Sequence, residues 1–272
     1  MKPVQPYFAL ASEKYYKRKF GSGDIAHIYE YDADAISSEY IYAIPDGCID
    51  IFIDEDDPDL KAYIAGTVLD GSPTPLEKGH KYIGIRFMPG VVPAFIEGTL
   101  KDFIDNTFDL SLCSKYTKII QDGIFSCRDF RAKANFIQVF YKKLLAEKAA
   151  DAFSSHYTIV KEIQKISDSS EGTIPIKDIV EKTGYTERYI DKVFKDETGL
   201  TPKTYCKIVR FQNTIQHINL DNDITLTALI TEHGYYDQSQ FIHEFKKLSG
   251  QSPLKYRRRI IESHYVSKFI LE

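Results

Sequence analysis

The sequence predicts an α+β N-terminal domain, mainly β with a helix or two at its C-terminal end, followed by an all-α domain that contains a doubled turn-helix unit. Three observations carry this prediction. Short runs of β-branched and aromatic residues occur before residue 110, apolar residues recur at helical spacing after residue 128, and a motif repeats near the end of the chain. With 272 residues, the chain is long enough for two domains that each bury a core.

Four short runs predict the strands of the front domain. They cover residues 41–44, 49–53, 63–66 and 82–87. Pro45-Asp46-Gly47 separates the first two runs, and its proline and glycine suit a tight turn. An acidic stretch at 54–59 follows the second run. Because blocks of like charge repel one another, we expect a solvated loop there rather than a metal site.

A helix is predicted over residues 128–150, where an apolar stripe recurs at three- and four-residue steps. The stripe consists of Phe136, Ile137, Phe140, Tyr141, Leu144 and Leu145. It could cover the β domain, or it could pair with the same stripe of a second copy, and the sequence leaves both roles open. A helix at 158–166 opens the second domain. We therefore expect domains at 1–150 and 158–260, with a boundary near 150–157.

The second domain begins with a pair of short helices, over about 176–196. Gly184 ends the first of them, and Thr186 caps the second. Thr201-Pro202 then starts a longer helix that runs to about residue 218. Proline suits this first turn because a backbone N–H at that position would have no acceptor within the helix, so its absence costs nothing.

A second pair of helices, over about 225–247, repeats the first pair, and Asp237 caps its outer helix. Gly184-Tyr185 recurs as Gly234-Tyr235 at an offset of 50, and the caps recur at an offset of 51, so one residue is added in the second turn. Two copies of one turn-helix unit present two similar surfaces at a fixed distance. A duplex, whose groove repeats every turn, is a natural partner for such a pair.

The charge balance neither requires nor excludes a nucleic-acid partner. The net charge is −4, and the apolar fraction of 43% is ordinary for a globular protein. Residues 1–150 carry 18 Lys and Arg against 22 Asp and Glu, whereas residues 177–259 carry 14 against 11. This falls short of the strongly basic domain that charge alone would identify as a nucleic-acid binder. The one dense basic run is at 255–259.

The cysteine pattern and the N-terminal sequence argue against a secreted protein. The lack of catalytic motifs argues against an enzyme. The four cysteines (48, 113, 127 and 206) form no C-x-x-C pair and are typical of reduced thiols. There is no secretory signal at the N-terminus and no apolar run long enough for a membrane span. His27 and His80 are far apart, and no zinc, serine-hydrolase or phosphate-loop motif occurs. We expect a cytoplasmic protein that is not an enzyme and needs no metal or cofactor.

The stretch Gly234-Tyr-Tyr-Asp-Gln-Ser-Gln-Phe-Ile-His-Glu-Phe-Lys-Lys-Leu-Ser-Gly-Gln-Ser-Pro-Leu-Lys-Tyr-Arg257 resembles the signature of the AraC/XylS transcription regulators, and the resemblance covers about 158–260. It implies two helix-turn-helix units joined by a long helix, each with its second helix in one major-groove segment. It also implies sequence-specific regulation of transcription, with double-stranded DNA and RNA polymerase as partners. The usual small alanine before each turn glycine is replaced by Val180 and Ile230.

The resemblance and the exposed helix positions together predict the residues that contact DNA. Arginine suits guanine and glutamine suits adenine, since each can make two hydrogen bonds to one base edge. The predicted base-reading residues are Thr186, Glu187, Arg188, Tyr189, Asp191, Lys192, Gln238, Ser239, Gln240 and His243. The predicted phosphate contacts, which set register and salt dependence, are Lys203, Lys207, Arg210, Lys255, Arg257 and Arg258.

The front domain resembles a small sensor-like domain of unknown function found before this module, through Pro45-Asp-Gly-Cys-Ile-Asp50 and Gly84-Ile-Arg-Phe-Met-Pro-Gly90. Two roles remain open. It could bind a small-molecule effector that changes DNA binding, with Tyr42, Cys48, Asp50 and Arg86 as candidate ligand residues. It could instead be a ligand-independent module that only forms a homodimer. Arg86 could also simply pair with Asp46 or Asp50.

Overall fold

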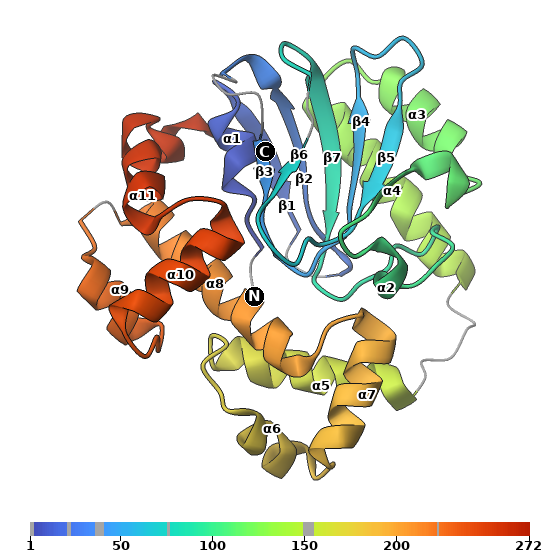
Figure 1. Cartoon of the computed structure of the whole chain (residues 1–272). Helices are drawn as coiled ribbons and strands as arrows, with labels where there is room; N and C mark the ends of the chain where they lie inside the picture. The colour runs from blue at the N-terminus through green and yellow to red at the C-terminus, as the bar shows by residue number, and fades with distance from the viewer. Residues whose placement is uncertain (1–2, 21–22, 36–40, 75–76, 149–154, 222) are drawn as a thin grey trace.

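The computed structural model describes residues 3–20, 23–35, 41–74, 77–148, 155–221 and 223–272 (Figure 1). A β-sheet with helices on its outer side forms the front half of the chain, and a group of helices forms the second half. The predicted order, a mainly β domain followed by an all-α domain, is confirmed. The predicted boundary near 150–157 falls mostly on 149–154, which lie outside the described residues.

The main sheet has seven strands in the order β8-β5-β4-β7-β2-β1-β9 among the residues described. The strands are β1 (Tyr15–Lys19), β2 (Ile25–Asp32), β4 (Asp50–Asp54), β5 (Ala62–Ala65), β7 (Lys81–Phe87), β8 (Thr107–Asp109) and β9 (Phe269–Leu271). Strands β3 (Ile41–Ala43) and β6 (Ser72–Thr74) form a separate pair. The four predicted strands correspond to β3, β4, β5 and β7. Among the described strands, every pairing is antiparallel except that of β1 with β9, which comes from the far end of the chain.

One face of this sheet is aliphatic. Strand side chains alternate between faces, so the buried residues Ile28, Ile51, Ile64, Ile83, Ile85 and Phe87 lie on one side. Helices α3 (Thr117–Phe125) and α4 (Phe130–Lys148) cover that side (Figure 1). The ring of Tyr141 on α4 is 5.5 Å from the ring of Phe87, centroid to centroid. The apolar stripe predicted at 136–145 thus packs on the sheet through Ile137, Tyr141 and Leu144.

The opposite face of the sheet is aromatic and charged. We call it the aromatic face, and its side chains include Tyr15, Lys17, His27, Tyr29, Tyr31, Asp50, Tyr82 and Arg86. The short helix α1 (Pro6–Leu10) and the second half of the chain cover it. One hydrophobic cluster runs from Tyr7 and Tyr29 into Phe211 and Tyr256 of the second half. The two halves therefore share a core.

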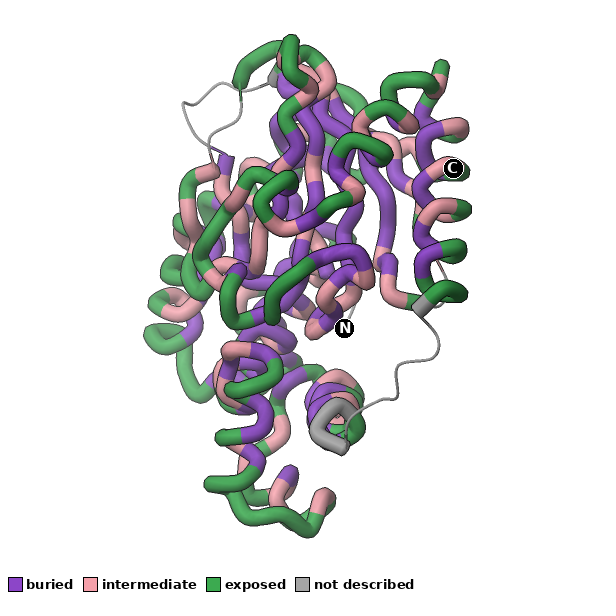
Figure 2. The backbone as a smooth tube through the Cα atoms, turned by 90° about the vertical axis from the view of Figure 1, so that its right-hand side faces the viewer, coloured by how far each residue is buried: buried purple, intermediate pink, exposed green. Residues whose placement is uncertain are grey.

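The second half consists of helices α5 to α11. Their bounds are α5 (Ser155–Ser169), α6 (Ile176–Thr183), α7 (Glu187–Thr198), α8 (Pro202–Leu220), α9 (Leu226–Glu232), α10 (Gln238–Ser249) and α11 (Pro253–Glu262). Helix α8 contributes buried side chains to the cores of both units, Val209 to the first and Phe211 to the second. Figure 2 shows that most of the tube farthest from the sheet is exposed. A short helix α2 (Leu100–Phe103) and a 3₁₀ turn η3 (Tyr265–Lys268) complete the contacts between the halves.

Candidate nucleic-acid interface

Helix α7 presents the first candidate surface. Gly184 has a φ of 72°, a left-handed conformation that lets the chain reverse between α6 and α7. The Thr186 hydroxyl then accepts a hydrogen bond from the Tyr189 backbone N–H at 3.4 Å. Ile190 and Phe194 are fully buried and fix the angle of the helix. The predicted residues Thr186, Glu187, Arg188, Tyr189 and Lys192 are exposed, and Asp191 is half-buried.

Helix α10 presents the second candidate surface. The Asp237 carboxylate accepts from the Gln240 backbone N–H at 2.7 Å, and the Gln240 side-chain oxygen accepts from the Tyr236 backbone N–H at 2.8 Å. These two bonds, one from the cap and one to the residue before it, fix the helix N-terminus. It also occupies the side-chain oxygen of Gln240, whose amide N–H groups remain free to donate to a partner. Gln238, Ser239, Gln240 and His243 are all exposed.

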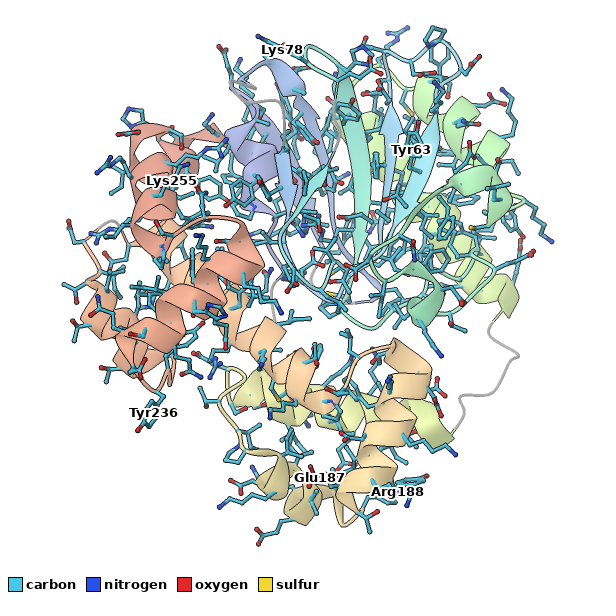
Figure 3. The ribbon with its side chains drawn as sticks, in the orientation of Figure 1. Tyr63, Lys78, Glu187, Arg188, Tyr236 and Lys255 are labelled. Carbon is cyan, nitrogen blue, oxygen red and sulfur yellow. The ribbon has the colours of Figure 1, made fainter. Side chains whose placement is uncertain are left out.

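The N-terminal ends of α7 and α10 lie on the side of the molecule remote from the sheet. Figure 3 shows Glu187 and Arg188 at the end of one unit and Tyr236 at the end of the other, all pointing away from the sheet. Helix α8 lies between the two units and packs on both. The outer surfaces of α7 and α10 are thus open to a partner rather than buried within the molecule.

The predicted phosphate contacts divide into two groups. Lys203, Lys207, Lys255 and Arg258 are exposed, whereas Arg257 is half-buried. Arg210 is already engaged within the molecule: its Nη2 is 2.7 Å from the Glu244 carboxylate, and its guanidinium lies 4.4 Å from the Tyr235 ring centroid. This contact joins α8 to α10. The structure therefore gives Arg210 a role in orienting the second outer helix.

Sequence reasoning missed two exposed tyrosines beside these helices. Tyr236 is the residue added in the second turn, and 89% of it is exposed. Tyr185 is partly exposed, and its ring lies 5.1 Å from the ring of Tyr189. The change of offset from 50 to 51 at this turn was the available signal, because an inserted residue has no place in a repeated core.

The four candidate effector residues do not all meet in one cavity. Cys48 and Asp50 line a cavity of about 160 Å³ on the aromatic face, together with Tyr29 and Asp46. Tyr42 packs instead against Tyr7, with ring centroids 5.8 Å apart. The Arg86 side chain is fully buried, and its Nε donates to the Asp50 carboxylate at 2.9 Å. We call the cavity lined by Cys48 and Asp50 the acidic cavity.

One cation, Arg86, lies between the Asp46 and Asp50 carboxylates of the acidic cavity. Burial raises the pKa of Asp50 to about 6, although the Arg86 guanidinium beside it acts in the opposite direction. Asp46 lies 3.6 Å from the Arg86 Nε and accepts from the Cys48 N–H and from Gln5. Neither a cluster of three metal-ligating side chains nor a helix long and apolar enough to cross a membrane occurs among the described residues.

Two family models match the chain. A "Helix-turn-helix domain" model matches residues 179–259, and a "Domain of unknown function (DUF6597)" model matches residues 22–109. The first contains both α7 and α10, and the second contains most of the sheet.

Known relatives match up to about half of the chain. The transposon Tn10 TetD protein of Escherichia coli is 26% identical over 47% of this chain and 87% of its own length. The multiple antibiotic resistance protein MarA of Salmonella typhimurium is 26% identical over 47% of this chain and 94% of its own. The Msm operon regulatory protein of Streptococcus mutans is 29% identical, over 39% of this chain and only 38% of its own length.

Solved structures are more distant. ToxT from Vibrio cholerae aligns over 87% of this chain and 99% of its own with a TM-score of 0.48 and 12% identity. The helix-turn-helix match, the relatives among transcription regulators and the doubled units with open outer helices agree with one another. This chain carries an AraC-type helix-turn-helix domain, matched over residues 179–259, and a domain of unknown function in front of it, matched over residues 22–109.

Proposed function

We propose that the chain binds one specific double-stranded DNA site with α7 and α10 in successive major-groove segments, and that its front domain controls this binding. The observation that carries the first part is the pair of capped helices whose outer faces are exposed on the same side of the molecule. Successive major-groove segments on one side of a duplex are about 34 Å apart. As a regulator, the bound protein would act on transcription by RNA polymerase at that site.

Each outer helix supplies a side chain suited to one kind of base. Arg188 is exposed in the first turn of α7, and its guanidinium can donate two hydrogen bonds to the O6 and N7 atoms of guanine. Gln238 is exposed in the first turn of α10, and its amide matches adenine in the same manner. Lys203, Lys207 and the other exposed cations would contact phosphates and would set the salt dependence.

Replacing Arg188 or Gln238 by alanine should weaken binding to the specific site. Each change removes a two-bond base contact worth about 1–3 kcal/mol, so the Kd should rise about 5- to 150-fold. Selection of bound sequences from random duplexes by the whole chain identifies the site, and fluorescence anisotropy measures the Kd. Lys78→Ala, at the far end of the molecule in Figure 3, is the control and should leave the Kd unchanged. Equal losses on specific and random DNA would contradict base reading.

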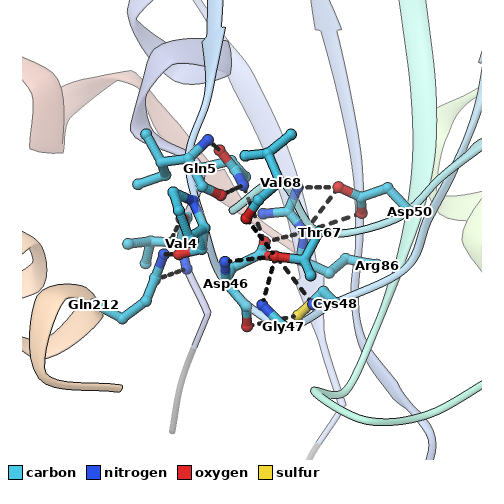
Figure 4. A network of polar contacts seen from close by, with 12 residues as sticks. Val4, Gln5, Asp46, Gly47, Cys48, Asp50, Thr67, Val68, Arg86 and Gln212 are labelled. Atoms are coloured by element: carbon cyan, nitrogen blue, oxygen red, sulfur yellow. Dashed lines mark hydrogen bonds and ion pairs between the residues drawn. The ribbon is translucent and has the colours of Figure 1, made fainter. Parts of the chain in front are cut away.

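Direct contacts between the halves support control by the front domain. The Val4 N–H donates to the Gln212 side-chain oxygen at 2.8 Å, and the Gln212 amide donates to the Pro45 carbonyl at 2.7 Å (Figure 4). Gln212 lies near the middle of α8, between the two units. The Tyr7 hydroxyl also donates to the Ser249 carbonyl at the end of α10, at 2.7 Å. A change in the front domain can therefore reach both the joining helix and the second outer helix.

Gln212→Ala tests whether these contacts carry control. The substitution removes the hydrogen bonds to Val4 and Pro45 but leaves every base-reading residue in place. We expect the Kd for the specific site to change at least threefold, because the front domain would no longer hold α8. Asn213→Ala, on the next position of the same helix, is the matched control. An unchanged Kd for Gln212→Ala, in a protein that still folds by circular dichroism, would contradict control through this contact.

The alternative is a front domain that only forms a homodimer. It is favoured by exposed apolar side chains on the outer surface of α3 and α4, among them Phe125 with 74% and Val139 with 68% exposed. Sedimentation of the whole chain distinguishes the two: a dimer that Phe125→Ser dissociates would support the alternative, and a monomer at high concentration would count against it.

A further inference from the structure

The last turns of both outer helices lie against the front domain, at the same position of the repeat. Gly199 ends α7 and Gly250 ends α10, and the two glycines are 51 residues apart, as the two N-terminal caps are. Both have a left-handed backbone, with φ of 74° and 78°, and both contact residues of the front domain. The front domain therefore contacts each outer helix at the end opposite to its candidate DNA surface.

The first of these contacts joins α7 to the segment that follows α2. A methyl group added at Gly199 would overlap the Cδ1 atom of Ile104 and would lie 3.0 Å from the Cα atom of Lys101. Ile104 also packs against the core of the first helix-turn-helix unit, which includes Phe194 and Leu200. Figure 1 shows α2 beside the end of α7 that is nearer to the sheet. An apolar side chain of the front domain is thus part of the packing at the end of the first outer helix.

The second contact joins α10 to β3 and to the loop before β6. A methyl group added at Gly250 would lie 2.7 Å from the ring of Tyr42. The Gly71 backbone N–H donates to the Lys247 carbonyl at 3.1 Å, close to the hydrogen bond from Tyr7 described above. Because the last carbonyls of a helix have no partner within the helix, these two donors of the front domain complete the end of α10.

Hydrogen bonds within the front domain join the two contacts to each other. Segment 101–106 carries the contact with α7, and the end of segment 66–71 carries part of the contact with α10. The Asp105 backbone N–H donates to the Thr67 carbonyl at 3.1 Å, and the Asp105 carboxylate accepts from the Leu69 N–H at 2.8 Å. We call these two segments the bridge. The bridge therefore connects the end of one outer helix to the end of the other.

We propose that the bridge determines which spacing of two half-sites the protein accepts on DNA, by holding the outer helices at Gly199 and Gly250. It adds a second connection between the units to the one made by α8. One base pair inserted between two half-sites moves them apart by about 3.4 Å and turns one relative to the other by about 34°. Two helices held at these ends cannot follow that change unless a contact breaks. This inference rests on the proposed function, in which each outer helix lies in its own major-groove segment.

The turn glycines that precede the outer helices have no such contact with the front domain. Gly184 and Gly234 are left-handed as well. Among the described residues, none lies within 4 Å of a methyl group added at Gly184, and one added at Gly234 would meet Thr173 of the helical half. A substitution at Gly199 or Gly250 would carry the same backbone cost and would, in addition, displace the front domain. The two effects can therefore be separated by a control glycine in open space.

The spacing selectivity of the whole chain tests the proposal. It is the Kd for a duplex with one base pair inserted between the half-sites, divided by the Kd for the selected site. We expect a ratio of at least about ten for the unmodified chain and below about three for Gly250→Ala, whose methyl group displaces α10 from Tyr42. Adding Tyr42→Ala to Gly250→Ala makes room for that methyl group and should restore the selectivity. Gly79→Ala is the matched control: its φ is 83°, no described residue lies within 4 Å of the added methyl group, and the ratio should stay unchanged.

Ile104→Ala tests the contact at α7 without any backbone cost, so it also serves if a glycine variant does not fold by circular dichroism. It should lower the ratio at least about threefold, because it removes the side chain that packs at the end of α7. An unchanged ratio in folded Gly250→Ala or Ile104→Ala, a ratio that Tyr42→Ala does not restore, or a ratio near one in the unmodified chain would overturn the role of the bridge and leave the proposed function standing. Selection of a single half-site by the unmodified chain would overturn the proposed function, and this inference with it.

Discussion

Arg86→Leu is expected to lower the free energy of unfolding by about 3–5 kcal/mol, enough to unfold a marginally stable domain. The Arg86 side chain is fully buried at the centre of the sheet, where it bonds Asp50 and lies 3.6 Å from Asp46. Removing the guanidinium leaves two buried carboxylates without a cation. Because those carboxyls would then hold a proton more readily in the folded state than in the unfolded state, the loss should be larger at pH 8 than at pH 5.

Urea denaturation followed by circular dichroism measures this loss. A second variant that combines Arg86→Leu with Asp50→Asn should recover part of the stability, since it removes one of the unpaired charges. Arg18→Leu, a cation on strand β1 of the same sheet that bonds Asn135 at the surface, is the matched control and should cost little. A loss for Arg86→Leu no greater than that of the control would show that the ion pair does not support the sheet.

Lys17→Met is expected to act in the opposite direction and stabilise the protein at neutral pH, by up to about 4 kcal/mol. The pKa of Lys17 is about 7 in the folded chain, below its ordinary value of 10.5. Between these values the unfolded chain binds the proton more tightly, so the cost of burying Lys17 is largest below pH 7 and disappears as the pH approaches 10.5. The advantage of methionine should therefore shrink as the pH rises.

The urea midpoints of Lys17→Met and of the unmodified chain, measured at pH 6.5 and 9.5, test whether the difference in stability shrinks as the pH rises. Lys19, His27, Arg86, Asp50 and Tyr265 also face this region, so the comparison is made between Lys17→Met and the unmodified chain at each pH, where their contributions largely cancel. A stability difference independent of pH would refute the buried charge as its cause.

The outer helices were predictable because their signals are local. Thr186 and Asp237 cap α7 and α10 as predicted, and Gly184 ends α6 in the left-handed conformation. A cap, a turn glycine and an apolar stripe all lie within a dozen residues, and tertiary contacts only reinforce them.

The strands beside Lys17 were missed because long-range pairing creates them. Tyr15–Lys19 carries three basic residues and has no sequence pattern typical of a strand, yet β2 and β9 pair with it on both sides. The ring of Phe269, about 250 positions later on the paired strand β9, lies 6.0 Å from the Lys17 ammonium. Arg210 illustrates the same limit: on the sequence it is one more cation on the joining helix, and only the fold brings Glu244 to it.

The parallel pairing of β9 with β1 means that the helical half departs from the front domain after α4 and returns to the same sheet at its other end. A body joined at one point can swing in any direction, whereas a body joined at two points can only rotate about the line between them. While β9 stays in place, this second connection adds to the shared core in limiting how the helix-turn-helix units can move relative to the sheet. Release of that short terminal strand would allow these units a wider range of orientations.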